Sequence, residues 1–278
     1  MTLLEVLQST TDYFKKRGIE NPRLNAEHLL AHTLKRKRIE LYLEFERALT
    51  EDELVPLREL VRRRGQGEPL QYLLGTVEFA GHIFLCDKRA LVPRPETEQL
   101  VEKIADCRLQ NADCRIVDVG TGSGVIALSL AAKFPNAKVI ATDLSEAALD
   151  LAQENARGLG LENVVFVKAD LLEGAAGEFD VIVANLPYVA IADRTMLSRE
   201  VLHDPEKALF GGERGDEMIR KLIDTAGSHL APGGLLALEV GIGQADDLAA
   251  LLAEKNYHDI KTERDFAGVI RFLFGRYG

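Results

Sequence analysis

The chain has 278 residues, of which 46% are hydrophobic and 28% charged, and its net charge is −10. This composition is typical of a globular protein with one large domain or two modest ones, and the acidic balance argues against a general nucleic-acid binder. No apolar run approaches the roughly 18 residues needed to cross a bilayer, and the first residues lack the pattern of a secretion signal. We therefore expect a cytoplasmic protein that is not embedded in a membrane.

The first part of the chain has the pattern of several short helices. Apolar residues recur every three or four positions within residues 2–64. Asn21 with Pro22 marks one helix start, and Thr50 with Glu53 forms a capping box at another. GQGEP (65–69) then interrupts the pattern. We expect a helical domain over residues 1–68.

Charge is unevenly distributed along the chain. Residues 1–75 contain 13 Lys and Arg and 12 Asp and Glu, a net charge of +1. Since the whole chain carries −10, the remaining residues carry −11. The basic clusters KRKR (35–38) and RRR (62–64) lie in this first part. Such clusters are most often solvated helix faces, and the alternative is a docking surface for RNA or an acidic protein.

The sequence pattern changes from helical to strand-like after the first domain. In LLGTVEFAGHIFLCD, apolar and polar residues alternate, which predicts a β-hairpin. We therefore assign residues 69–92 to a linker that contains this hairpin. LVPRPETEQLVEKIAD then opens a third region, residues 93–278, with a helix start at Pro95. Beyond it, strand and helix patterns alternate, beginning with RIVDVG (115–120) and ending with VIRFLFGR (269–276). This alternation predicts an α/β fold with a mostly parallel, doubly wound sheet that binds ligands at the carboxyl ends of its strands.

Three cysteines occur without CxxC spacing, at Cys86, Cys107 and Cys114. An odd number without such spacing favours reduced thiols over disulfides. None of the six histidines has a metal-ligand spacing either. We expect no bound metal.

A glycine-rich loop joins the first strand of the third region to its first helix. DVGTGSG (118–124) allows a tight turn and a close approach of backbone to a ligand. The predicted ligand contacts in this loop are Gly120, Thr121, Gly122, Ser123 and Gly124, and Asp118 can fix the loop or face a ligand's ammonium group. The positive end of the following helix suits an anion.

Acidic residues follow the next two strands. Asp143, beside Leu144, can accept both ribose hydroxyls of a nucleoside. Asp170, beside Leu171, can accept an adenine amino group. These contacts fit a nicotinamide dinucleotide or S-adenosylmethionine. The segment Asn185-Leu186-Pro187-Tyr188 after the fourth strand favours the second ligand, since this order of motifs matches class I methyltransferases.

The chain resembles the release-factor glutamine methyltransferases over nearly its whole length. The similar blocks are, in order, GEPLQYLLGTVEFAG, LVPRPETEQLVE, DVGTGSG, NLPYV, ALFGGERG, LAPGGLLALEVGIGQ and DFAGVIRF. The resemblance implies a helical N-terminal domain, a β-hairpin linker and a C-terminal methyltransferase domain. It also implies transfer of methyl from S-adenosylmethionine, with S-adenosylhomocysteine as product, to glutamine N5 in the Gly-Gly-Gln tip of peptide-chain release factors. We expect a monomer without direct nucleic-acid binding.

Within this resemblance, the segment after the fourth strand is interpreted as a clamp for an amide. The side-chain oxygen of Asn185 and the backbone C=O of Leu186 can hold the two amide hydrogens, so that the nitrogen lone pair points at the methyl group. Pro187 stiffens the turn and Tyr188 packs on the amide plane. The family usually has proline where Leu186 stands, and glutamate where Asp204 stands. We expect Leu186 to contribute only its backbone.

Further residues are candidates for the walls and the support of the cleft. Arg94 and Glu96 are candidate walls for the substrate, the alternative being a charged helix start. Glu239 and Gln244 follow a strand and are expected to support the cleft from behind.

Four other functions remain open at this point. They are glutamine methylation of a ribosomal protein, methylation of an amino group in nucleic acid such as adenine N6, a non-catalytic adaptor that keeps the fold, and a dehydrogenase that uses the glycine loop. An acidic catalytic region without an added basic module speaks against nucleic acid. The dehydrogenase has no use for Asn185.

Overall fold

The computed structural model describes residues 1–106 and 113–278. It divides into two compact units, residues 1–76 with 198–203, and residues 77–197 with 204–278. Cys86 and Cys114 are buried free thiols whose pKa is raised by burial, whereas Cys107 lies outside the described residues. Among the helices described, none is both long and apolar enough to span a membrane.

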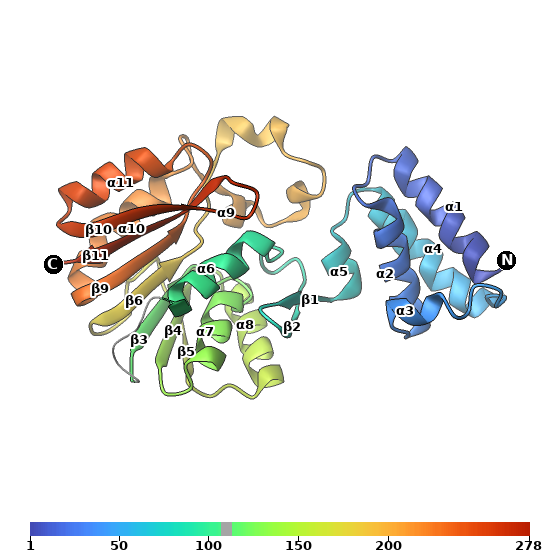
Figure 1. The fold of residues 1–278 in the computed structure, drawn as a ribbon, viewed down its shortest axis with the longest axis horizontal. Coiled ribbons are helices and arrows are strands. Elements are labelled where there is room, and N and C mark those ends of the chain that lie inside the picture. The colour runs from blue at the N-terminus through green and yellow to red at the C-terminus, as the bar shows by residue number, and fades with distance from the viewer. Residues whose placement is uncertain (107–112) are drawn as a thin grey trace. The chain divides into compact units, whose positions relative to one another are not determined.

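The first unit is helical, as its sequence pattern predicts (Figure 1). Its helices are α1 (Leu3–Lys16), α2 (Pro22–Leu34), α3 (Arg38–Leu41), α4 (Glu51–Gly65) and α5 (Leu70–Leu74), and the 3₁₀ turn η2 (Val201–His203) joins them. Their apolar faces meet in one core that includes Leu3, Leu7, Phe14, Leu29 and Leu30. The five-residue α5 was not predicted, because so short a helix has too few positions to show a period.

Two predicted helix starts have different outcomes. At α4 the backbone N–H of Thr50 donates to the Glu53 carboxylate at 2.9 Å, as the capping box predicts. Asn21 stands before α2 with a left-handed φ of 47°, and its side chain makes no capping hydrogen bond. The helix start predicted at Pro22 is confirmed, but Asn21 does not cap it through its side chain. Instead, Asn25 donates to the Asn21 carbonyl at 3.2 Å.

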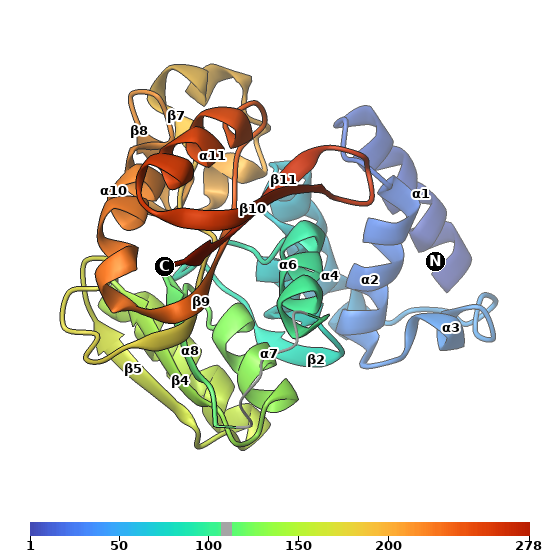
Figure 2. The same cartoon turned by 60° about the vertical axis from the view of Figure 1, so that its left-hand side comes forward.

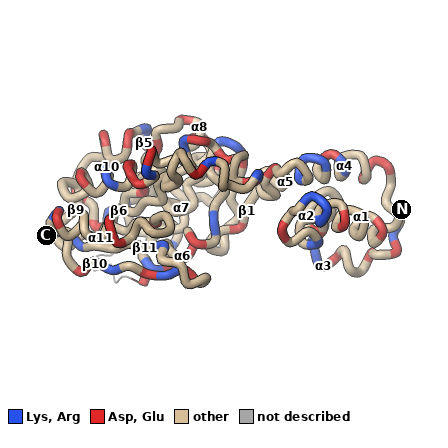
Figure 3. The backbone as a smooth tube through the Cα atoms, turned by 90° about the horizontal axis from the view of Figure 1, so that it is seen from above, with Lys and Arg blue, Asp and Glu red and all other residues tan. Residues whose placement is uncertain are grey.

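The arginine clusters of this unit are paired with carboxylates. Arg62 binds Glu59 at 2.6 Å, and Arg63 binds Glu68. Arg64 is only 3% exposed; it donates to Asn25 at 2.7 Å and to Glu200 at 2.6 Å. Figure 3 shows Lys and Arg interspersed with Asp and Glu along these helices. The cluster at 62–64 thus does not form an uncompensated positive patch: Arg62 and Arg63 lie on an ordinary charged helix face, whereas Arg64 is buried.

The second unit contains a small hairpin and a large sheet. The hairpin consists of β1 (Thr76–Phe79), which begins at the unit boundary, and β2 (His82–Leu85), and α6 (Pro95–Asp106) follows it. The seven-stranded sheet has the order β10-β11-β9-β6-β3-β4-β5. Its strands are β3 (Arg115–Val119), β4 (Lys138–Asp143), β5 (Val164–Lys168), β6 (Phe179–Ala184), β9 (Leu230–Glu239), β10 (Tyr257–Arg264) and β11 (Ile270–Tyr277).

Strands β5, β4, β3, β6 and β9 are mutually parallel, whereas β11 runs antiparallel between β9 and β10. The edge strand β10 was not predicted. Most of its residues are exposed or half-buried, so the apolar alternation that marks a strand is weak there.

Helices cover both faces of this sheet, and Figures 1 and 2 show α7 and α8 on one side and α10 and α11 on the other. These helices are α7 (Val125–Lys133), α8 (Glu146–Leu159), α10 (Glu217–Ala226) and α11 (Ala245–Glu254). Successive strand residues enter different cores, as the pleat requires: Ile116 packs with α6 and α7, and Val117 packs with α10 and α11. The α/β, doubly wound prediction is confirmed.

Short elements fill the connection between β6 and α10. They are β7 (Val189–Ala190), η1 (Ile191–Met196), α9 (Glu206–Leu209) and β8 (Phe210–Gly212), in addition to η2; a further turn, η3 (Gly227–His229), follows α10. β7 pairs in parallel with β8. The first strand of the sheet, β3, lies between β4 and β6. From β3 the chain first adds β4 and β5 on one side and then β6 on the other side. The strand order therefore reverses at β3, and sheets of this kind bind their ligands at such a point.

Candidate functional site

A cavity of about 490 Å³ opens at the carboxyl ends of β3, β4, β5 and β6. Most of the predicted site residues lie in its wall, namely Arg94, Gly120, Thr121, Gly122, Ser123, Asp143, Leu144, Asp170, Leu171, Asn185, Leu186 and Pro187. Four predicted residues are not in the wall: Glu96, Asp118, Gly124 and Tyr188. The topology thus brings motifs from positions 94 to 187 into one site.

The glycine loop and the Asn185 segment pack directly on each other. Gly120 has φ 73°, and a Cβ there would lie 2.8 Å from Cδ2 of Leu186. The Leu186 side chain is 3% exposed and belongs to the apolar core on that face of the sheet. The Leu186 side chain thus also packs the site, because it fills the space that Gly120 leaves open, whereas the expectation that only its backbone acts in the clamp stays a prediction.

Asp118 holds the loop from beneath and is fully buried. Its Oδ2 accepts from the Thr121 hydroxyl at 2.6 Å and from the Ala127 N–H at 3.1 Å. Burial raises the pKa of Asp118 to about 7, against the effect of these two hydrogen bonds. Its Oδ1 has no partner among the described residues. The loop-fixing role is observed, and contact with a ligand's ammonium stays a prediction.

Asp143 and Asp170 face the cavity with part of their hydrogen-bonding capacity in use. Asp143 accepts from the N–H of Gly122 at 2.9 Å and from that of Ser145 at 2.8 Å. Asp170 accepts from Lys221 Nζ at 2.6 Å. A carboxylate has about four acceptor positions, so each can still accept hydrogens from a ligand.

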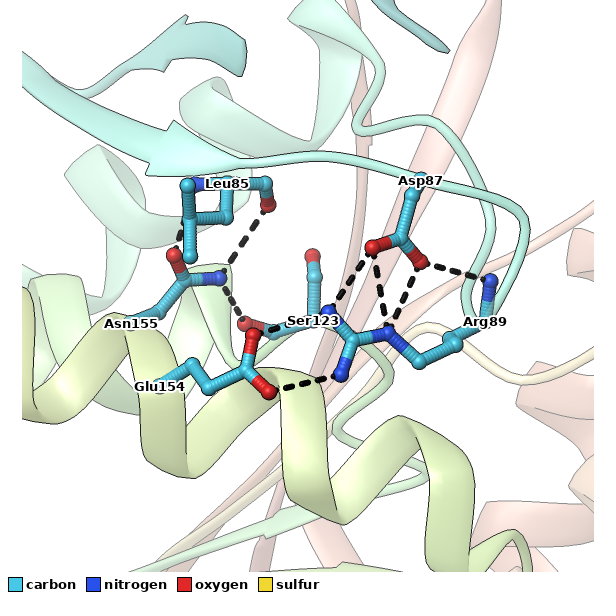
Figure 4. Close-up of polar contacts among 6 residues, drawn as sticks. All are labelled: Leu85, Asp87, Arg89, Ser123, Glu154 and Asn155. Atoms are coloured by element: carbon cyan, nitrogen blue, oxygen red, sulfur yellow. Dashed lines mark hydrogen bonds and ion pairs between the residues drawn. The ribbon is translucent and has the colours of Figure 1, made fainter. Parts of the chain in front are cut away.

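Side chains that the sequence analysis missed tie the hairpin to the loop (Figure 4). Asn155 of α8 accepts from the Leu85 N–H at 2.6 Å and donates to the Ser123 carbonyl at 2.9 Å. Arg89, which lines the cavity, binds Asp87 and Glu154, each at 2.8 Å. These partners are up to 70 residues apart in the chain, and no local pattern reveals them.

The Asn185 carboxamide is held by buried residues of two other elements. Its Nδ2 donates to the Thr97 hydroxyl oxygen at 3.0 Å, and that hydroxyl donates to Glu239 Oε2 at 2.7 Å. Gln244 Nε2 donates to the Tyr188 carbonyl at 2.9 Å. The predicted support by Glu239 and Gln244 is thus present. Thr97 was missed, since within PRPETE it looks like an ordinary helical residue.

The turn after Asn185 is also shaped by a close backbone approach. A Cβ at Gly211 would lie 2.3 Å from the Pro187 carbonyl oxygen, so only glycine permits β8 to pair with β7 there. The Tyr188 ring lies 5.8 Å from the Arg271 guanidinium, and burial raises the pKa of its phenol to about 12. Tyr188 therefore helps to build the turn from outside the cavity.

Arg94 is fixed in the cavity wall by Asp204, at 2.6 Å. Asp204 is buried and also accepts from the Val92 N–H at 3.1 Å. The shorter aspartate, where the family usually has glutamate, thus still reaches its partners. Glu96, the neighbour predicted with Arg94, does not line the cavity.

The parallel sheet with one reversed strand, and the cavity behind its glycine loop, define a class I methyltransferase domain. A family model described as a methyltransferase domain matches residues 110–257, and one described as the PrmC N-terminal domain matches residues 5–75. Over most of its length, the chain is similar to proteins named release factor glutamine methyltransferase. It is 39% identical to that of Geobacter sulfurreducens over 100% of this chain and 97% of the relative. It is 37% identical to that of Escherichia coli K12, over 93% of each. The chain belongs to the release factor glutamine methyltransferase family.

Solved structures agree on the fold. The chain is similar to a 16S rRNA N2 G1207 methyltransferase of T. thermophilus, solved with AdoMet and guanosine, with a TM-score of 0.53 and 20% identity. This match covers 73% of this chain and 50% of that one. A ribosomal protein L11 methylase of Lactobacillus delbrueckii subsp. bulgaricus matches with a TM-score of 0.50 and 25% identity, over 66% of this chain and 79% of that one.

Proposed function

We propose that this protein transfers a methyl group from S-adenosylmethionine to the side-chain amide nitrogen of the glutamine in the Gly-Gly-Gln tip of peptide-chain release factors, in the cytoplasm. The observation that carries the proposal is the orientation of Asn185. Because its Nδ2 is bound to Thr97, its Oδ1 is left as an acceptor in the cavity wall. The names of the relatives, which match almost the whole chain, support the choice of substrate.

The cavity fits a nucleoside that carries an amino acid. Asp143 can accept the ribose hydroxyls and Asp170 an adenine amino group. Leu144 is apolar, 57% exposed and in the wall, so it offers a surface for a flat base. The buried, unpartnered Oδ1 of Asp118 adds a hydrogen-bonding group beneath the loop. When bound, S-adenosylmethionine supplies a methyl group on a positively charged sulfur, which makes that carbon electrophilic.

The protein's own contribution to transfer is positioning of the substrate amide. The lone pair of an amide nitrogen is delocalised, so the group must be held in one orientation. The Oδ1 of Asn185 and the C=O of Leu186 can each accept one of the two amide hydrogens. Among the described residues none donates to the Leu186 carbonyl. Positioning of this kind can supply much of the rate enhancement. The proton of the methylated nitrogen becomes acidic as the N–C bond forms and passes to water.

We further assign residues 1–68 to release-factor docking, 69–92 to the linker and 93–278 to catalysis. Since Arg62, Arg63 and Arg64 are paired within their own unit, the docking surface is sought elsewhere on it. Ile39 is 71% exposed and Leu43 85% exposed, both on or beside the short α3. These apolar side chains suit a protein partner better than a nucleic acid.

The deciding experiment is transfer of labelled methyl from S-adenosylmethionine to purified candidates. A release factor with the Gly-Gly-Gln tip should be labelled, and the matched protein with Gly-Gly-Ala should not. Mass spectrometry should place one methyl group on the glutamine side chain. Labelling of ribosomal proteins, DNA or RNA, with an unlabelled release factor, would overturn the proposal in favour of those substrates.

A further inference from the structure

Three side chains from separate elements form one hydrogen-bonded row that ends at the cavity. Glu239 is the last residue of β9, Thr97 lies in the first turn of α6, and Asn185 follows β6. Glu239 is 1% and Thr97 2% exposed. The two hydrogen bonds of the row are 2.7 and 3.0 Å long. Glu239 does not line the cavity, whereas Asn185 does, so any effect of Glu239 on a substrate passes through Asn185, which Glu239 influences both through Thr97 and directly.

The direction of each hydrogen bond follows from the charge of Glu239. A carboxylate only accepts, so the single hydroxyl hydrogen of Thr97 must point at Glu239. The Thr97 oxygen is then an acceptor toward Asn185, which must present its NH₂. The carboxamide oxygen therefore points the other way, where it can accept a hydrogen from a substrate amide.

A protonated Glu239 permits the opposite arrangement. It can donate to the Thr97 oxygen, which frees the Thr97 hydrogen to point at Asn185. The carboxamide must then present its oxygen to Thr97 and its NH₂ to the cavity. There the NH₂ faces the hydrogens of a substrate amide, donor against donor, and the clamp cannot hold it.

We propose that Glu239 and Thr97 are positioning residues that set the orientation of the Asn185 carboxamide, and through it whether the site can hold a substrate amide. The inference rests on the proposed function for its catalytic consequence, and on the observed row for the orientation itself.

The surroundings of Glu239 place this switch in an accessible pH range. Burial raises its pKa to about 7; Thr97, Arg271 and Asn185 act in the opposite direction, and the negative charge of Glu96 acts with burial. The Tyr188 phenol also faces this group, and burial raises the pKa of that phenol. A raised pKa means that the carboxylate, which enforces the productive orientation, is lost as the pH falls through about 7, and below that pH the opposite arrangement becomes accessible.

The first test distinguishes the effect of the Thr97 hydroxyl group from that of the side chain's volume. Thr97→Val keeps the shape and removes the hydrogen bonds, so kcat should fall by roughly 10–100-fold, as for other residues that orient a site group. Binding of S-adenosylmethionine should change little, and Thr97→Ser should restore most of kcat. Thr225→Val is the matched control, since its hydroxyl bonds only to carbonyls of its own helix, α10. Wild-type kcat in a folded Thr97→Val would overturn the proposal.

The second test uses pH and a signal that needs no substrate. In protein labelled with ¹⁵N, the Asn185 side-chain amide signal is assigned by its loss in Asn185→Ala. It should titrate with a midpoint near 7, as the pKa of Glu239 requires, and should stop titrating in Glu239→Gln. The acidic loss of kcat should vanish in the same variant. Asp118 has a pKa in the same range but is unchanged in Glu239→Gln, so a titration that persists there would overturn the proposal. If no release factor is methylated at all, the proposed function fails, and this signal still decides the orientation.

Discussion

The Leu186 side chain lies against the backbone of Gly120, so the clamp and the glycine loop are parts of one packed unit. Truncating Leu186 to alanine should leave a cavity and lower the free energy of unfolding by about 2–4 kcal/mol. Leu186→Pro keeps the backbone carbonyl and part of the volume, and should keep methyl transfer within a few-fold of the parent. Chemical denaturation and methyl transfer measure the two effects. An inactive but folded Leu186→Pro would show that this turn differs from that of its relatives.

Asn185 contributes its side chain, and its loss should affect catalysis far more than stability. Asn185→Ala removes one preorganised acceptor for the substrate amide, so methyl transfer should fall by roughly 10²–10³-fold. Calorimetric titration should show S-adenosylmethionine binding close to that of the parent. Equal losses in binding and rate would instead place Asn185 on the methyl donor.

Asp143 combines a ligand contact with a structural one. Asp143→Ala should weaken S-adenosylmethionine binding by on the order of 2–3 kcal/mol, because charge-assisted hydrogen bonds to ribose are lost and the Gly122 N–H loses its acceptor. Asp150→Ala, an exposed substitution on α8, is the control. Affinity that is unchanged in Asp143→Ala by calorimetry would refute the ribose assignment.

The buried Asp118 predicts an unusual pH dependence of stability. Its pKa is raised to about 7 in the folded protein, so folding favours the protonated form. Its contribution is therefore most favourable below the unfolded pKa of about 4 and is lost as the pH rises through about 7. The difference in unfolding free energy between Asp118→Asn and the parent should therefore shift in favour of the variant by on the order of 2 kcal/mol as the pH rises from about 5 to about 8. A difference that stays constant across this range would mean that Asp118 is ionised throughout.

The exposed apolar residues of the helical unit provide a test of docking. A double substitution, Ile39→Glu with Leu43→Glu, should raise KM for an intact release factor and leave kcat for a short Gly-Gly-Gln peptide unchanged. Both side chains are largely exposed, so the fold should persist by circular dichroism. An unchanged KM for the intact factor would remove this surface from the proposal.

Much of the sheet was predictable, because most strands and helices of the second unit, β10 excepted, carry a clear apolar pattern. β3, Arg115–Val119, lies within the predicted strand RIVDVG (115–120). The sequence also placed the glycine loop and Asn185 at strand ends, where a parallel sheet gathers them. Thr97 and Asn155 escaped prediction because their roles depend on partners 88 and 70 residues away. The packing of the Leu186 side chain against Gly120 was likewise not predictable, because the local sequence does not show which distant residue a side chain contacts.

The path of the chain between its units limits how far the protein is modular. The helical unit includes residues 198–203, so the chain passes between the units after Thr76, Leu197 and His203. A fragment that ends at residue 76 would lack Glu200, the carboxylate that neutralises the buried Arg64. A buried charge without its partner is strongly destabilising. The helical unit therefore cannot be exchanged as residues 1–76 alone. A chimera that takes these residues from a relative must also take the segment of that relative that corresponds to residues 198–203.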